Sequence, residues 1–207
     1  MPRVKKNLTA PSRLLYRAGR PVPQITITST QEAQVIAALK AFPKMAKIAM
    51  RRALNKTAVS GKSNAKNLIH SDFNITKGAI SEKIHVKNAS SNRLEAQINA
   101  SGKRLSLIEG RFGVFERRPK GVFVKIKRGG MRSRLPSAFL GRKGGGTGQR
   151  TVFVRLGQAR LPIRPVTTVS IPYMLRLQTR ELEVFLRDKM RKTFFQELNF
   201  ERSKLVK

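Results

Sequence analysis

Positively charged side chains are the reactive groups that this sequence offers in quantity. The chain of 207 residues has 44 Lys and Arg against 11 Asp and Glu, a formal net charge of +33. Residues 101–150 form the most basic segment that we expect to be structured, with 14 basic and 2 acidic residues. Such charge attracts phosphate groups in a salt-sensitive way that does not depend on base sequence. We therefore expect this segment to contact a polyanion, and nucleic acid is the first candidate.

The candidates for phosphate contact lie between residues 117 and 143, on expected strands and a glycine-rich loop. They are Arg117, Arg118, Lys120, Lys125, Lys127, Arg128, Arg132, Arg134, Arg142 and Lys143. The 11 Phe and 2 Tyr stand mostly where a core needs them, and they are not interleaved with basic residues as a base-stacking platform would be. The expected contact is therefore diffuse. The alternative is that these side chains bind acidic faces of neighbouring proteins.

No arrangement of residues in the sequence is typical of an enzyme. The chain has no Cys, which excludes disulfides, thiolate metal sites and thiol catalysis. Of the two histidines, His70 is expected as the C-terminal cap of a helix and His85 as an exposed strand residue. The carboxylates between residues 82 and 116 occur singly among basic residues, not as catalytic pairs. We expect no catalytic residue, no metal and no cofactor.

The N-terminal part is expected to be a basic arm followed by helices. Residues 1–28 are assigned to the arm, because the first 24 contain six basic residues, four Pro and no acid; the alternative is a charged tail that only aids solubility. Ser29 and Glu32 fit a capping box, so a helix is expected over about 29–42. Pro43 suits a first helical turn, which predicts a second helix to about residue 68 and a short third one near 75–83.

From residue 84 the hydrophobic period changes from helical to alternating. The pattern predicts an antiparallel sheet of about five or six strands, over residues 84–86, 94–98, 105–115, 121–127, 151–156 and 160–166. Five glycines between residues 141 and 150 indicate a flexible basic loop, which we assign to residues 127–150.

The last expected element is an amphipathic helix over residues 171–198. Its apolar stripe includes Leu182 and Leu186, and Glu183 precedes Arg187 at the favourable i,i+4 spacing. Five of the 11 acidic residues lie between residues 181 and 201, so the charge that faces phosphate is expected elsewhere.

The expected fold class is α+β, with N-terminal helices, an antiparallel β-sheet with a long basic loop, and a long C-terminal helix packed on the sheet. A single domain is expected over residues 29–200, with a C-terminal tail over 201–207. No apolar segment approaches the roughly 18 residues of a membrane helix. We therefore expect no membrane association and synthesis in the cytoplasm. The predicted core contains Ile48, Leu54, Val124, Phe153, Leu182 and Leu186.

Several short motifs follow one another between residues 33 and 200. They are Ala-Met-Arg-Arg-Ala-Leu-Asn-Lys-Thr-Ala at 49–58, Lys-Asn-Leu-Ile at 66–69, Ile-Thr-Lys-Gly-Ala-Ile at 75–80, Leu-Pro-Ser-Ala-Phe at 135–139, Val-Phe-Val-Arg at 152–155, Leu-Pro-Ile at 161–163 and Ser-Ile-Pro at 170–172. In this order they resemble the minor tail protein Z family of lambda-like tailed bacteriophages and prophages, also called tail-completion proteins. The basic arm departs from the shorter family members.

The resemblance implies a structural virion protein at the head-proximal end of the tail, made in the host bacterial cytoplasm. The implied partners are the tail terminator, the neck or head-completion proteins, the tail tube, phage DNA and other copies of the chain. The copies are expected to form a ring, hexameric because such tails have six-fold symmetry, with twelve left open. The ten basic candidates would then line the DNA channel. The alternative function is a ribosomal or other sequence-nonspecific RNA- or DNA-binding protein, and co-purification with ribosomal RNA or with phage tails would distinguish the two.

Overall fold

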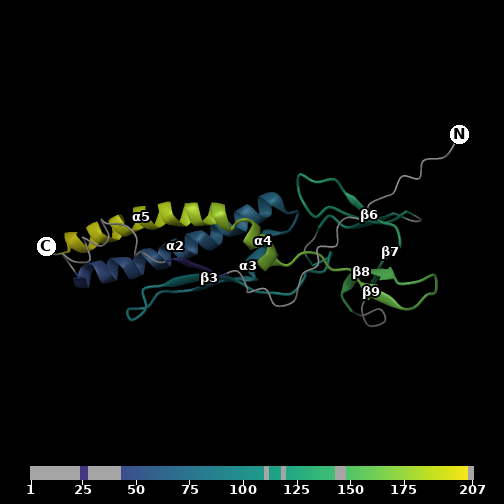
Figure 1. The fold of residues 1–207 in the computed structure, drawn as a ribbon, viewed down its shortest axis with the longest axis horizontal. Helices are drawn as coiled ribbons and strands as arrows, with labels where there is room; N and C mark the ends of the chain where they lie inside the picture. Colours follow the sequence, from purple (N-terminus) through teal and green to yellow (C-terminus); the bar gives the residue numbers. More distant parts are fainter. Residues whose placement is uncertain (1–23, 28–42, 110–111, 118–119, 143–147, 205–207) are drawn as a thin grey trace, which may run out of the picture.

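The computed structural model describes residues 24–27, 43–109, 112–117, 120–142 and 148–204. The molecule is elongated, and its described residues form two parts (Figure 1). We call residues 24–27, 43–100 and 171–203 the body, and residues 115–165 the lobe. The body contains the helices and one small sheet, and the lobe contains two further small sheets at the opposite end of the long axis.

Two long helices form one layer of the body. α2 spans Pro43–Asp72 and α5 spans Thr179–Ser203, and they pack antiparallel along most of their length (Figure 1). The shorter α3 (Lys77–Ser81) and α4 (Ile171–Leu177) lie at the end of α2 that faces the lobe. Pro43 begins α2 as predicted. Among the described residues, no helix combines the length and the apolar character that crossing a membrane would require.

The C-terminal helical region begins at Ile171 as predicted, but it is interrupted at Gln178 and extends beyond its predicted end. A break at Gln178, which has φ −98° and ψ 4°, divides the expected helix into α4 and α5. Ser170 begins α4 by accepting a hydrogen bond from the Tyr173 N–H at 3.4 Å. Residues 201–203, expected in a tail, continue α5 because Glu201 is buried against α2 and makes ion pairs there. The predicted helix over 29–42 lies outside the described residues.

Small side chains line the buried face of α2. They are Ala46, Ala49, Ala53, Ala58 and Ala65, all fully buried. Ile48 is 39% exposed, so its predicted place in the core is wrong: it lies off the buried face, which carries these alanines together with Met50, Leu54 and Ile69. The other predicted core residues, Leu54, Val124, Phe153, Leu182 and Leu186, are buried, which confirms their assignment.

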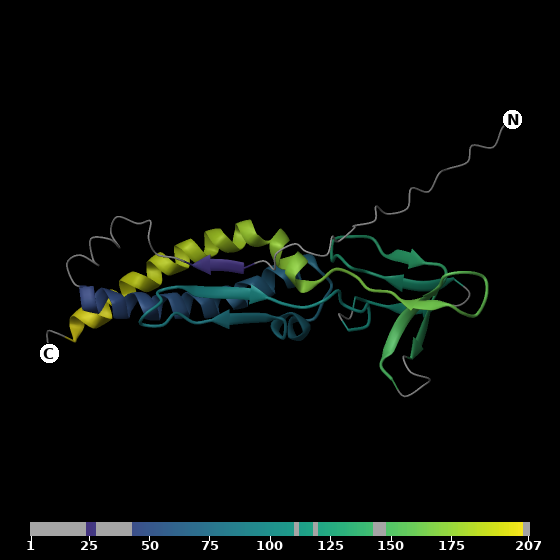
Figure 2. The ribbon, with the colours of Figure 1, turned by 60° about the horizontal axis from the view of Figure 1, so that its bottom comes forward.

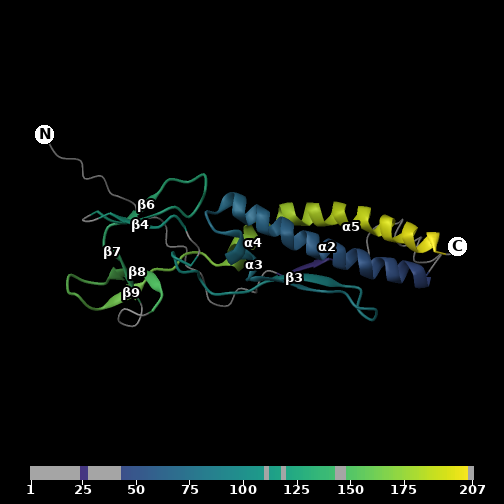
Figure 3. The ribbon, with the colours of Figure 1, turned by 180° about the vertical axis from the view of Figure 1, so that it is seen from behind.

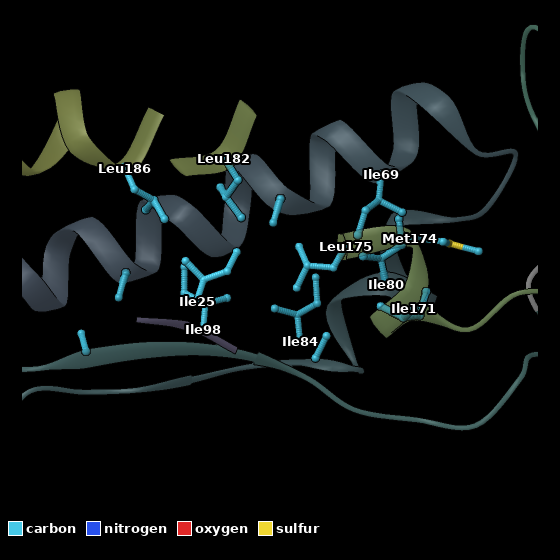
Figure 4. Packing of buried hydrophobic residues seen from close by; sticks show 14 of the residues in the cluster. Ile25, Ile69, Ile80, Ile84, Ile98, Ile171, Met174, Leu175, Leu182 and Leu186 are labelled. Atoms are coloured by element: carbon cyan, nitrogen blue, oxygen red, sulfur yellow. The ribbon is translucent and has the colours of Figure 1, made fainter. Parts of the chain in front are cut away.

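A three-stranded antiparallel sheet forms the second layer of the body. Its order is β1 (Gln24–Ile27), β3 (Ala96–Ala100), β2 (Ile84–Lys87), and Ile25, Ile98 and Val86 lie opposite one another in register. Figure 4 shows Ile25 and Ile98 directed toward Leu182 and Leu186 of α5. Residues 24–27 were expected in the arm; they form a strand instead because Ile25 reaches this core and the backbone pairs with β3.

Gly61 lies where the two long helices meet the sheet. A Cβ at this position would stand 2.6 Å from Leu186 Cδ2 and 2.7 Å from Ile98 Cδ1. Both of these side chains are buried, so the absence of a side chain at residue 61 is what lets α2, α5 and β3 approach one another. Helix propensity alone would make a glycine at this position a weak point of the helix.

The lobe consists of two three-stranded antiparallel sheets. The first has the order β4 (Phe115–Arg117), β5 (Gly121–Val124), β6 (Ser133–Leu135), and the second the order β7 (Ala138–Arg142), β8 (Arg150–Arg155), β9 (Ile163–Pro165). Figures 2 and 3 show both sheets at the end of the molecule away from the C-terminus. In the described ranges the strands therefore form three separate sheets and not one of five or six strands.

The lobe contains more regular structure than its sequence predicted. Residues 133–135 and 138–142 are strands although the whole of 127–150 was expected to be a loop. The reason is apolar packing, because Ala138 is buried and Leu135 and Leu140 pack against the core. Residues 143–147 of this segment lie outside the described residues.

Backbone hydrogen bonds join the lobe to the body at two places. The segments that enter and leave the lobe pair with each other, since the Thr168 N–H donates to the Leu105 carbonyl at 2.8 Å and Ser106 forms an antiparallel bridge with Thr167. Near the end of α2, the Asn74 N–H donates to the Ile126 carbonyl at 2.8 Å. These bonds hold the lobe in a defined position on the body.

Candidate nucleic-acid interface

All of the lobe after Glu116 falls within a long stretch of sequence that has no acidic residue. Between Glu116 and Glu181 the chain has 64 residues with 16 Lys and Arg and without a single Asp or Glu. This stretch includes β5 to β9 and α4. One end of the molecule therefore carries a large excess of basic charge, with Glu116 of β4 as the one acidic residue in the sequence of the lobe, and its positive potential extends into solvent.

The first sheet of the lobe presents arginines beside a pair of stacked rings. Phe115, Phe123 and Arg134 are register partners and share one face, whereas Val122 on the other face is buried. The Phe115 and Phe123 rings stack with their centroids 5.1 Å apart, and the Arg132 guanidinium lies 5.1 Å from the Phe115 centroid. Arg134 Nε donates to the Lys120 carbonyl at 2.7 Å. These contacts hold the guanidinium groups in fixed positions.

The second sheet places two arginines directly opposite each other. Arg142 on β7 and Arg150 on β8 are register partners and both are exposed. Arg164, opposite Val154, lies on the same face of the sheet by strand alternation. Like charges directly opposite on neighbouring strands repel, and an anion between the two guanidinium groups would remove this repulsion. The Arg142–Arg150 pair is therefore suited to hold a phosphate.

The other face of the second sheet repeats the combination of rings and arginine. Phe139 and Phe153 stack with centroids 6.0 Å apart, and the Arg155 guanidinium lies 4.7 Å from the Phe139 centroid. Sequence analysis assigned the aromatic residues mostly to cores. In the lobe Phe153 is buried as predicted, but Phe115 is 38% exposed, and the rings of Phe115 and Phe139 also support arginines.

The structure brings together only part of the predicted site. Four of the predicted residues are exposed on the first sheet or its connections: Arg117, Lys120, Arg132 and Arg134. A fifth, Arg142, is exposed on the second sheet. Arg118 and Lys143 lie outside the described residues. The remaining three, Lys125, Lys127 and Arg128, follow β5 toward the end of α2.

Arg128 completes the C-terminal end of α2. Its Nε donates to the His70 carbonyl at 2.6 Å, one of the last helical carbonyls that lack an intrahelical partner, and its Nη2 lies 2.8 Å from His70 Nδ1. Lys127 Nζ lies 5.9 Å from the centre of the Phe73 ring. Arg128 therefore supplies the cap that was expected from His70, and its guanidinium is occupied by this contact.

Sequence reasoning missed the arginines that follow residue 143. Four exposed arginines lie on β8, on β9 and in the loop between them: Arg150, Arg155, Arg160 and Arg164. Both strands were predicted. Their alignment with β7 was not, and that alignment is the signal that would have placed Arg150 opposite Arg142.

Two acidic side chains of the body, Glu197 and Glu201, form ion pairs with neighbouring basic residues. Glu197 pairs with Lys56, and Glu201 pairs with Arg52 and with Lys204, the last at 2.9 Å. The hydrogen bond from Lys204 holds the pKa of Glu201 below its ordinary value of 4.5. Across the described ranges, no group of three or more His, Cys, Asp or Glu is placed to bind a metal ion.

Comparison with known proteins gives one match. The model of the family described as prophage minor tail protein Z (GPZ) matches residues 32–206, which is most of the chain. No curated protein matches the chain, and no solved structure matches it.

Proposed function

Because the chain belongs to the prophage minor tail protein Z family, and thus to the structural proteins of the phage tail, we propose that it is a tail-completion protein. In this proposal several copies form a ring at the head-proximal end of the tail, and the lobe of each copy faces the DNA channel. The implied neighbours are the tail terminator, the neck or head-completion proteins and the tail tube. Family membership favours this function over that of a ribosomal protein.

The observation that carries the proposal is the lobe at one end of an elongated molecule, which from β5 onward has no acidic residue. A ring of such molecules, with their lobes directed inward, would surround the channel with arginine and lysine. DNA must move through a channel, so its wall needs phosphate contacts that are individually weak and that read no bases. Exposed arginines such as Arg117, Arg142 and Arg150 meet this requirement.

The Arg142–Arg150 pair allows a direct test of phosphate binding. The double variant R142Q/R150Q removes two positive charges from one face of the second sheet. We expect its affinity for a short duplex of arbitrary sequence to fall and the slope of log K against log salt to decrease by about 1–2, because about 0.9 is lost for each phosphate contact removed. Fluorescence anisotropy over a range of salt concentrations measures both quantities.

Thermal stability separates loss of binding from loss of fold in this test. Removing two like charges that face each other leaves the unfolding midpoint unchanged or higher. The matched control is K62Q/K66Q, which removes the same charge from α2 and is expected to leave the salt slope unchanged. A wild-type slope in R142Q/R150Q would exclude this pair from the DNA interface.

A further inference from the structure

One face of the first sheet of the lobe combines aromatic rings with arginines from all three strands. Phe115 and Arg117 share this face of β4, because they are two residues apart on one strand. Their neighbours on it are Phe123 of β5 and Arg134 of β6, which are register partners of Phe115. Arg132, just before β6, joins them through its contact with the Phe115 ring. We call these five residues the ring–arginine face.

The opposite face of this sheet packs inward. Val122 and Val124 are buried, and Leu135 packs against the core. Glu116 is the register partner of Val122, so it belongs to this inner side of the sheet. The described residues of the ring–arginine face therefore include three arginines and no acid. Only strand pairing produces this arrangement, because the rings and the arginines do not alternate along the sequence.

Phosphate contact alone does not explain the rings. Phe115 is 38% exposed although Arg132 contacts it, and Phe123 is half-buried. A face that bound phosphate groups alone would need only its arginines. Phenyl rings and guanidinium groups both stack on the planar faces of nucleobases, and arginines also pair with the phosphates between those bases. The ring–arginine face offers both kinds of contact within one small sheet.

We infer that the ring–arginine face binds single-stranded nucleic acid, with bases stacked on Phe115 and Phe123 and phosphates held by the arginines. The bases of a duplex stack on one another and present only their edges in the grooves, so a duplex cannot use the rings. A single strand presents base faces and phosphates together. Stacking accepts any base. The inference thus adds a ligand class to the proposed function without sequence reading, and it does not depend on the ring of copies.

Two single strands of equal charge test the role of the rings. The probes are a labelled oligothymidylate of about 12 nucleotides and a strand of the same length in which every base is replaced by an abasic site. Fluorescence anisotropy with the purified full-length chain measures both affinities. We expect the wild type to prefer the oligothymidylate, and F115L to lower its affinity for that probe about 5- to 150-fold while binding the abasic strand as before. F115Y, which keeps the ring, should retain the preference.

Three further variants identify the source of any change. F200L removes a ring that is 53% exposed and lies 4.4 Å from Lys204 Nζ, but on α5; it should bind as the wild type does. R117Q should weaken binding of both strands equally. R142Q/R150Q should weaken duplex binding and keep the preference for bases. Thermal unfolding of each variant checks its fold.

The outcomes separate this inference from the proposed function. Equal binding of the two strands by the wild type would overturn the inference and leave duplex binding intact, as expected if the face serves an acidic protein. A preference for bases that persists in F115L would also overturn it. A preference lost in F115L, in a chain that does not bind the duplex, would support the inference and contradict the proposed channel contact.

Discussion

Glu201 is the residue whose ionisation most directly links the two long helices. It is nearly buried, it pairs with Arg52 of α2 and Lys204 at the end of α5, and the hydrogen bond from Lys204 lowers its pKa. A carboxylate with a lowered folded-state pKa stabilises the protein above its unfolded-state pKa, and this stabilisation is lost as pH falls through the folded-state value.

The variant E201Q should therefore be less stable than the wild type near pH 7. The difference should shrink below about pH 4.5, the ordinary value for this carboxyl group, because the wild-type side chain then becomes protonated. Urea unfolding at neutral and acidic pH measures the difference. E183Q, at an exposed position without an ion pair in the described residues, serves as control and should show no such pH dependence. An E201Q difference that stayed constant with pH would contradict the assignment.

At the residue scale, the sequence predicted which basic side chains are exposed better than it predicted what they contact within the molecule. The exposed Arg117 and Arg142 were predicted, since local charge density indicates them. Arg128 also lies in a densely basic stretch of sequence. Its guanidinium nevertheless caps α2 through a contact with His70, 58 positions away. The expected Glu183–Arg187 pair is not among the ion pairs of the described residues. Such differences depend on tertiary contacts, which composition and spacing do not contain.

Among the elements, α2 shows how a glycine can stabilise a helix pair. The variant G61A gains up to about 1 kcal/mol in helix propensity, but its Cβ would overlap the buried Leu186 and Ile98 side chains. Overpacking costs about 1–3 kcal/mol, so after the gain in helix propensity we expect a net loss of up to about 2 kcal/mol in unfolding free energy. G78A is the control, because a Cβ at Gly78 meets nothing within 4 Å; it should be neutral or stabilising. A more stable G61A would mean that the helices can move apart without loss.

The helices were more predictable than the sheets for a physical reason. The start of α2 at Pro43 and the apolar stripe of α5 depend on neighbours within a few residues, and both were confirmed. The sheet of the body pairs β1 with β3, which lie some 70 residues apart in the sequence. The six strands of the lobe divide into two sheets according to which strands form hydrogen bonds with one another, and the sequence pattern of each strand does not specify its neighbour. The buried face of α2 was predicted only in part, because Ile48 was assigned to the core and is 39% exposed.

At the scale of the whole molecule, charge is distributed unevenly along the long axis. Five of the 11 acidic residues lie on α5 in the body, and the lobe from β5 onward has none. If the lobe faces the DNA channel, equal changes of net charge should have unequal effects at the two ends. The effect of a substitution on DNA contact then depends on where the charge lies along the molecule and not on the change in net charge.

Two variants with the same loss of charge test this polarity in phage particles. R117Q/K120Q/R142Q/R150Q in the lobe should leave tail length normal and lower the fraction of particles that retain DNA and infect. K44Q/K47Q/K62Q/K66Q on α2 should change neither quantity. Electron microscopy of the tails and plaque counts per particle give the measurements. Failure of the lobe variant to assemble tails would instead indicate that these side chains bind acidic neighbouring proteins.

The lobe is inserted between the two helices that form the body, and this has a consequence for synthesis. α2 ends at Asp72 and its partner α5 begins at Thr179. At about 5–20 residues per second, the ribosome needs roughly 5–20 s to make the intervening chain. During that interval the alanine-lined face of α2 has no α5 to cover it. The nascent chain must therefore depend on a chaperone, or on the rapid pairing of α2 with β2 and β3, until its last helix emerges.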